Sequence, residues 1–260
     1  MKQELERYPV TGRFLLGRTR YVLDDGGKAA LEAAMARVVD YPADTVLCVR
    51  GELSLKSAII IEGFALRIGG DAHHRCILAI CMPGDFIDLH AFGYGPLDHD
   101  VVALGPVRLG EVHHSDLLDH VLDKPQLMRA FWSATLLDSA IQRQWTLKVG
   151  QLKAPNRVAH LFSELWHRMD MIGLADPDGF RIPLTQADLA GMCGTTAIHL
   201  NRALGELRRK GIADFRRGEV STPDRALLEQ FGMFRADYLT RALPNIPIPS
   251  LRYLPENTKM

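Results

Sequence analysis

The spacing of apolar and polar residues changes twice along the chain and divides it into three parts. Residues 26–38 are rich in good helix formers and predict a helix. Between residues 46 and 112, apolar runs of four to six residues alternate with Gly, Pro and Asp. This pattern is typical of short strands in an antiparallel sandwich or barrel. From residue 115 onward, apolar residues recur every three or four positions, which indicates helices.

The helical part begins with a short helix, which Ser115 and Asp116 are placed to cap and which we expect to end before Pro125. A near-heptad apolar stripe then predicts one helix over residues 126–151. The stripe contains Leu127, Phe131, Ala134, Leu137 or Asp138, Ile141 and Trp145. A helix of this length with an apolar stripe needs a partner helix, and a second copy of the chain is the simplest partner. A further helix is expected over residues 156–169.

The segment PLTQADLAGMCGTTAIHLNRALGELRRKG predicts two short helices joined by a glycine turn. Thr185 is expected to cap the first helix, with Asp188 reaching back to it. Gly194 makes the turn, and Thr195 or Thr196 caps the second helix. The inner face of the second helix is expected to hold Ile198 or Leu200, Leu204 and Leu207. After it, IADFRRGEVSTPD predicts a β-hairpin, or wing, with two arginines at its tip.

The outer face of the second helix is polar at its start and basic at its end, which suits base edges and phosphates of DNA. Arginine and asparagine side chains can each bond a base edge with two hydrogen bonds. The candidate DNA-binding residues are Thr185, Gln186, Thr196, Ala197, Ile198, His199, Asn201, Arg202, Arg208, Arg209, Lys210, Arg216 and Arg217. The alternative is a helical hairpin that makes only protein contacts, with its arginines solvated.

Composition narrows the class of protein. Hydrophobic residues make up 47% and charged residues 24% of the 260 residues, which excludes disordered and fibrous chains. No apolar run approaches the roughly 18 residues of a membrane span, the N-terminus lacks the apolar core of a secretion signal, and four cysteines are too few for a disulfide framework. We therefore expect a cytoplasmic protein without a membrane partner.

Residues 181–260 hold 12 of the 31 basic and 8 of the 31 acidic residues, which favours a polyanionic partner. No catalytic motif occurs, so we do not expect an enzyme.

These motifs resemble those of the Crp/Fnr transcription regulators. PLTQADLA, MCGTT, HLNRALGELRRKG and FRRGEV carry the resemblance, which extends more loosely to PGDF at residues 83–86 and covers roughly residues 40–225. It implies an α+β fold with an N-terminal antiparallel double-stranded β-roll, jelly-roll-like and of the cyclic-nucleotide-binding kind, then a dimerisation helix and a C-terminal winged helix-turn-helix. It also implies base reading from the start of the recognition helix, with Arg202 as a base contact.

We accordingly expect a sensor domain over residues 1–124, a dimerisation helix over 125–152, a winged helix-turn-helix over 153–225, and a C-terminal helix with a proline-rich tail over 226–260. The chain is then a homodimer that binds an inverted repeat in double-stranded DNA and works with RNA polymerase. A signal in the β-roll would shift the long helices and reset the spacing of the two recognition helices. The effector, the operator, and the choice between activation and repression stay open.

The effector site departs from the family pattern. Relatives that bind cyclic AMP have PGDF, one apolar residue, then Gly-Glu-Leu, and some ten residues later Arg-Ser-Ala. Here Asp88 and Leu89 stand at the glycine and glutamate positions, and no arginine lies between Arg75 and Arg108. We therefore expect no cyclic AMP in the usual mode, while an apolar ligand or none remains open. The candidate pocket residues are Asp85, Phe86, Asp88, Leu89, His90 and His99.

Haem or another metal is an alternative ligand. Seven of the ten histidines lie in the predicted sensor domain, and His74 and Cys76 share a strand face, so these two are candidate ligands. In that case the chain is a haem- or metal-binding sensor that acts mainly through protein contacts. The simpler interpretation is that these are surface or turn histidines, in which case the chain has no cofactor or metal site.

Overall fold

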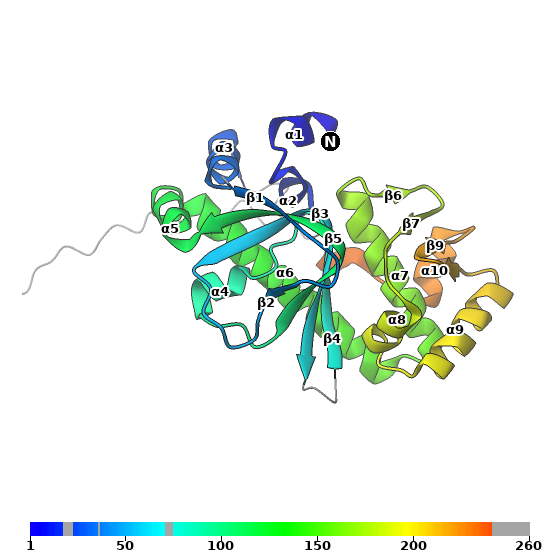
Figure 1. Ribbon diagram of the computed structural model, residues 1–260. Helices are drawn as coiled ribbons and strands as arrows, with labels where there is room; N and C mark the ends of the chain where they lie inside the picture. Colours follow the sequence, from blue (N-terminus) through cyan, green and yellow to red (C-terminus); the bar gives the residue numbers. More distant parts are fainter. Residues whose placement is uncertain (18–22, 36, 71–74, 241–260) are drawn as a thin grey trace, which may run out of the picture.

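The computed structural model describes residues 1–17, 23–35, 37–70 and 75–240, which form an α+β fold with two antiparallel sheets. Figure 1 shows the larger sheet beside a group of helices and short strands at the C-terminal end. The helices near the larger sheet are α1 (Lys2–Arg7), α2 (Gly12–Gly17), α3 (Asp25–Ala34), α4 (Leu89–Tyr94) and α5 (His114–Asp123). The expected helix over 26–38 is therefore too long, because its β-branched end belongs to the first strand of the sheet.

The larger sheet has the strand order β1-β5-β3-β4, with β2 paired to β5. Its strands are β1 (Arg37–Tyr41), β2 (Val46–Cys48), β3 (Lys56–Gly70), β4 (Arg75–Cys81) and β5 (Asp100–His113). The antiparallel sheet is confirmed, but the expectation of short strands is wrong for β3 and β5. Glu62 and Gly63 do not end a strand, because the register shifts there and lets β3 continue. Gly63 has φ +87° and lies so close to Pro106 that a Cβ atom would meet its carbonyl oxygen at 2.3 Å.

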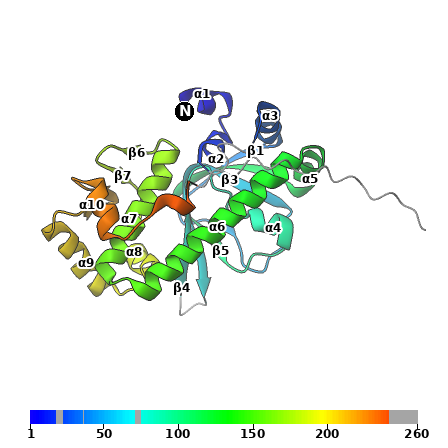
Figure 2. The same ribbon diagram turned by 180° about the vertical axis from the view of Figure 1, so that it is seen from behind.

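The long helix α6 (Pro125–Gln151) has the predicted bounds to within one residue, and Pro125 occupies its first turn. Figure 2 shows α6 crossing the molecule from α5 towards the C-terminal group of helices. The short helix α5 begins at His114, so Ser115 and Asp116 lie inside its first turn rather than at its cap. None of the helices within the described residues is both long and apolar enough to cross a membrane.

The predicted apolar stripe of α6 does not face outward. Leu127, Phe131, Ala134, Ile141 and Trp145 are all buried within the same chain. Phe131, for example, packs edge-on against Phe86 of the sheet region, with 5.7 Å between the ring centres. The stripe is therefore satisfied intramolecularly, and its assignment to a second copy is wrong. The opposite side of α6 carries a second set of apolar side chains that are exposed: Met128, Trp132, Leu136 and Leu147.

The C-terminal group contains α7 (Ala154–Met171), β6 (Ala175–Asp176), β7 (Gly179–Arg181), α8 (Gln186–Met192), α9 (Ala197–Arg209), β8 (Asp214–Arg216), β9 (Glu219–Ser221), α10 (Arg225–Phe231) and a single turn of 3-10 helix at Ala236–Tyr238. The wing strands join β6 and β7 in a second sheet of order β6-β7-β9-β8. The predicted helix after Ala226 ends at Phe231. Gly232 then lies so close to α7 that a Cβ atom would meet the backbone nitrogen of His160 at 2.6 Å.

The larger sheet and the C-terminal group share one hydrophobic core. Leu66 and Ile80 of the sheet belong to the same buried cluster as Phe162 and Trp166 of α7. This cluster also includes Leu189 of α8. The two parts of the chain are therefore packed on each other rather than connected only by α6.

Candidate functional site

The two short helices have the caps and the turn that the sequence predicts. Thr185 and Asp188 form a reciprocal capping box at the start of α8, in which the Asp188 backbone nitrogen donates to Thr185 Oγ1 at 3.1 Å. Gly194 adopts φ +56° in the turn. Thr196 rather than Thr195 caps α9, where it accepts a bond from the backbone nitrogen of His199. Because caps fix the start of α8 and the start of α9, the first turn of α9 has a defined orientation.

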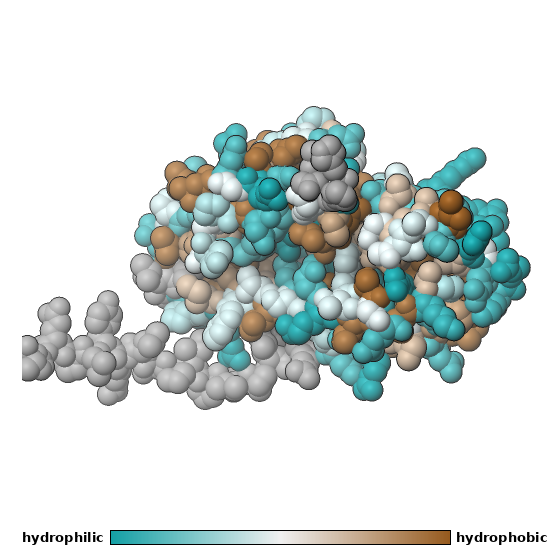
Figure 3. All heavy atoms as spheres, turned by 90° about the horizontal axis from the view of Figure 1, so that it is seen from below, coloured by the Kyte–Doolittle hydropathy of each residue, from teal (hydrophilic) through white to brown (hydrophobic). Residues whose placement is uncertain are grey.

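One face of α9 is buried and the other is open. Leu200, Ala203, Leu204 and Leu207 are buried, so Leu200 rather than Ile198 completes the inner face. The residues expected to read bases are all exposed: Thr196, Ala197, Ile198, His199, Asn201 and Arg202. In Figure 3, hydrophilic side chains gather at the right-hand end of the molecule, which α9, β9 and α10 form in Figure 1.

The cations near this surface fall into two groups. Three make ion pairs with neighbouring carboxylates: Arg208 and Arg216 with Asp214, and Lys210 with Glu206. Arg202, Arg209 and Arg217 make no ion pair within the described ranges. Exposed pairs of this kind contribute about 0–1 kcal/mol each, so a phosphate group can compete for the cation.

The wing brings the start of α8 next to basic residues. Its turn consists of Arg217 and Gly218, with φ values of +50° and +81°, which suit a tight hairpin. The Gly218 carbonyl accepts a hydrogen bond from the Ile182 backbone nitrogen at 2.7 Å, so the wing is fixed to the segment before α8. Thr185, Gln186, Arg208, Arg216 and Arg217 line one surface hollow as a result. Five of the candidate DNA-binding residues thus lie together in this hollow, six lie at the start of α9, and Arg209 and Lys210 lie at the C-terminal end of α9.

Most of the candidate pocket residues are enclosed by protein. Asp85, Phe86, Asp88, Leu89 and His99 are buried, and His90 is partly buried. Phe86 packs against Phe14 of α2 and Phe131 of α6. Burial, Arg67 and His99 lower the pKa of His90 to about 4, so its ring is neutral at pH 7. The imidazole of His99 lies 2.7 Å from the exposed carboxylate of Asp98.

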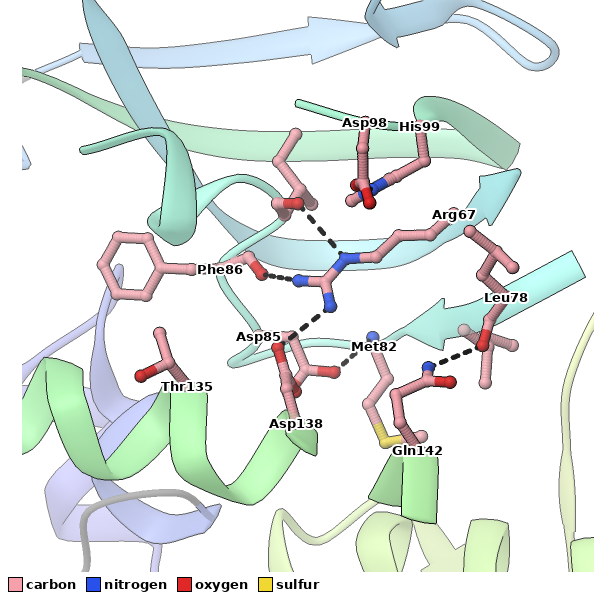
Figure 4. A network of polar contacts seen from close by, with 12 residues as sticks. Arg67, Leu78, Met82, Asp85, Phe86, Asp98, His99, Thr135, Asp138 and Gln142 are labelled. Carbon is pink, nitrogen blue, oxygen red and sulfur yellow. Dashed lines mark hydrogen bonds and ion pairs between the residues drawn. The ribbon is translucent and has the colours of Figure 1, made fainter. Parts of the chain in front are cut away.

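Arg67 and Arg168 are buried cations that the sequence analysis did not single out, and they connect this region to two helices. The Arg67 guanidinium donates to the carbonyl oxygens of Phe86 and Ile87 and pairs with Asp138 of α6 at 2.9 Å (Figure 4). Arg168 of α7 pairs with Asp85 at 2.8 Å. The one visible signal for Arg67 was a charged residue inside the apolar run FALRI.

Asp88 makes the stability of this region depend on pH. Its side chain accepts a hydrogen bond from the Ala58 backbone nitrogen at 2.8 Å. Burial nevertheless raises the pKa of Asp88 to about 7. Because an aspartate in the unfolded chain has a pKa of about 3.9, the folded chain keeps a proton that the unfolded chain has released. The contribution of Asp88 to the free energy of unfolding is therefore fully present below about pH 4 and is lost as the pH rises to about 7.

Replacing Asp88 with asparagine is expected to remove this pH dependence, because the amide oxygen still accepts from Ala58 and carries no charge. The variant should gain stability relative to the original chain as the pH rises from about 4.5 to about 7, and the gain should then level off. Urea denaturation at a series of pH values measures the difference. A difference that stays constant over this range would show that Asp88 is ionised in the folded protein.

Of the two candidate haem or metal ligands, Cys76 alone has a described position. Cys76 is exposed on β4, and His74 lies outside the described residues. Within the described ranges, no three His, Cys, Asp or Glu side chains converge in a way that could hold a metal ion.

Comparison with protein families identifies one domain of the chain. Residues 156–231 match the family model of the Crp-like helix-turn-helix domain. No curated protein sequence matches the chain.

Three solved structures have the same fold. FixK2 from Bradyrhizobium japonicum has a TM-score of 0.68 and 21% identity, over 75% of this chain and 96% of FixK2. TTHA1359, a Crp/Fnr-family transcriptional regulator from Thermus thermophilus, has a TM-score of 0.60 and 18% identity, over 76% of this chain and 98% of its own. CLP, a c-di-GMP-responsive global regulator from Xanthomonas campestris, has a TM-score of 0.61 and 16% identity, over 76% of this chain and 99% of CLP. The chain therefore contains a Crp-like helix-turn-helix domain at residues 156–231 and shares its fold with these three structures over about three quarters of its length.

Proposed function

We propose that the chain is a homodimeric, sequence-specific regulator of transcription that acts by binding DNA and not by catalysis. The observation that carries the proposal is the start of α9, where six residues expected to read bases are exposed. Caps at the starts of α8 and α9 hold this helix in place. A helix presented in this way fits the major groove. Its partners are double-stranded DNA with an inverted repeat and RNA polymerase, so it works in the cytoplasm, where transcription takes place.

The exposed side of α6 supports the dimer. Met128, Trp132 and Leu136 follow one another at four-residue steps, and Leu147 lies three turns further along the same side. This stripe lies opposite the buried one, so it is free to pack against the same stripe of a second copy. We propose that two copies pair through this face, with residues 125–152 as the dimerisation helix between a sensor domain (1–124) and a winged helix-turn-helix (153–225).

Arg67 supports the proposal that the protein does not use cyclic AMP in the usual mode. Its guanidinium joins the turn after PGD to Asp138 of the long helix (Figure 4). The chain thereby makes with its own side chains a connection between sheet and helix that a bound effector could otherwise provide. Asp88 and Leu89 are both buried, so neither is presented to a ribose.

Selection of bound fragments from random duplex DNA at near-physiological salt tests the function. We expect an inverted repeat with half-site centres about ten base pairs apart, without added ligand and unchanged by cyclic AMP. Failure to enrich any motif, with and without the nucleotide, would contradict the proposal that α9 reads DNA. Enrichment only with cyclic AMP would contradict the effector proposal and leave the DNA-binding proposal intact.

Replacing Arg202 with alanine is expected to weaken operator binding by about 1–3 kcal/mol and to relax the base preference at one position of each half-site. Arg202 is exposed and makes no ion pair with any described residue, so its loss should leave the fold unchanged. The measurement is a binding profile over single-base operator variants. Arg235→Ala is a suitable control, because Arg235 is also exposed and, among the described residues, pairs with nearby Asp237 alone. A profile identical to that of the original chain would exclude Arg202 as a base contact.

A further inference from the structure

The exposed face of α9 contains one large apolar side chain among its polar ones. Ile198 has 67% of its surface exposed and belongs to none of the buried clusters within the described residues. Asn201 and Arg202 follow it at three and four residues, so the three side chains form one stripe on the helix. A molecule that contacts Asn201 and Arg202 therefore also meets Ile198, which lies one helical turn closer to the N-terminus of α9.

The packing of the chain itself does not explain this isoleucine. The helix caps and the inner face are complete without it, because Thr196 and Leu200 fill those roles. A β-branched residue is also a weaker helix former than alanine or leucine. In a helix, however, its side chain is held in essentially one rotamer, so little entropy is lost when it packs against another molecule.

Gly205, further along the same stripe, is also not explained by packing within the chain. A Cβ atom at Gly205 would meet only the tip of the Arg209 side chain, at 3.8 Å. Glycine inside a helix is unfavourable by about 1 kcal/mol relative to alanine, and no packed neighbour requires it here. A small residue at this place suits a helix that lies close against an external partner.

We propose that Ile198 reads thymine, by packing on its 5-methyl group at the base pair next to the one that Arg202 and Asn201 contact. The inference rests on the proposed function and specifies its sequence preference. The thymine methyl group is the one apolar feature that a base pair presents in the major groove, and apolar side chains are the groups that contact it. Polar residues would be expected at this position if the neighbouring bases were read through hydrogen bonds alone.

The methyl group can be removed without changing the protein or the base pairing. In the selected operator, each thymine of the half-site is replaced in turn by deoxyuridine, and binding is measured at fixed salt. At one position we expect a loss of about fourfold per half-site, or about fifteenfold when both half-sites are changed, as follows from one buried methyl group each. If no replacement weakens binding, the inference is overturned, while tight operator binding leaves the proposed function intact.

Two variants assign the effect to this side chain. Ile198→Ala should bind the thymine and deoxyuridine operators equally well, whereas Ile198→Val should keep most of the preference. Leu53→Ala is the matched control, because Leu53 is 68% exposed but lies in the sheet region. A thymine preference that persists in Ile198→Ala overturns the assignment to Ile198. If the original chain binds no duplex at all, the proposed function fails and the inference fails with it.

Discussion

Replacing Trp132 with glutamate is expected to turn the protein into a monomer and to weaken its binding to an inverted repeat by two to four orders of magnitude. Trp132 is 65% exposed in the middle of the outer apolar stripe of α6. Burying a large apolar side chain stabilises an interface by roughly 1.5–3 kcal/mol, and a two-fold axis counts each side chain twice. The sum of about 3–6 kcal/mol corresponds to the stated range of affinity. In addition, two glutamates would face each other across the axis.

Light scattering during size-exclusion chromatography gives the mass of the particle, and a titration of operator DNA gives its affinity. Leu53→Glu is the control, because Leu53 is equally exposed but does not lie on α6. We expect this control to remain dimeric and to bind DNA normally. A Trp132→Glu protein that stays dimeric would show that the outer stripe is not the interface.

Replacing Arg168 with methionine is expected to lower the free energy of unfolding by about 3–5 kcal/mol, the usual effect of breaking a buried ion pair. Arg168 is buried and pairs with Asp85 at 2.8 Å, and its guanidinium also donates to the Ile80 carbonyl at 3.1 Å. A second buried carboxylate, that of Glu164, lies 3.6 Å away. Methionine fills similar space but leaves both carboxylates without their shared cation.

Arg225→Met is the matched control for this effect. Arg225 also pairs with two carboxylates, those of Asp170 and Glu229, but it is partly exposed. Its loss should lower the free energy of unfolding by less than about 1 kcal/mol. Urea denaturation at one protein concentration compares the variants. If both variants lose the same free energy of unfolding, burial does not set the strength of the ion pair between Arg168 and Asp85.

The helix-turn-helix could be predicted from sequence almost residue by residue, because its determinants are local. The Thr185 cap, the Gly194 turn and the spacing of Leu200, Leu204 and Leu207 all act within one or two helical turns. The partner of the long helix could not be predicted in the same way. Periodicity locates an apolar stripe, but α6 has apolar residues on two sides, and the sequence does not say which side the same chain covers.

The region around PGDF also depended on distant residues. Phe86 packs on Phe14, and Arg67 pairs with Asp138, which lies 71 residues further along the chain. Such contacts are set by the tertiary fold, and no local pattern encodes them. The resemblance to relatives correctly identified the turn, but the residues that fill the space beside it come from α2, β3 and α6 and are not part of the motif.

The core that the sheet shares with α7 and α8 limits how the chain can be recombined with its relatives. A graft that moved residues 153–240 onto another sensor domain would expose the side chains that pack on Leu66 and Ile80, unless the new sheet offered the same shape. Such a chimera should lose solubility before it loses the ability to recognise DNA. Exchange of α9 and the wing alone leaves this shared core intact, and it is therefore the safer way to give the protein a new operator.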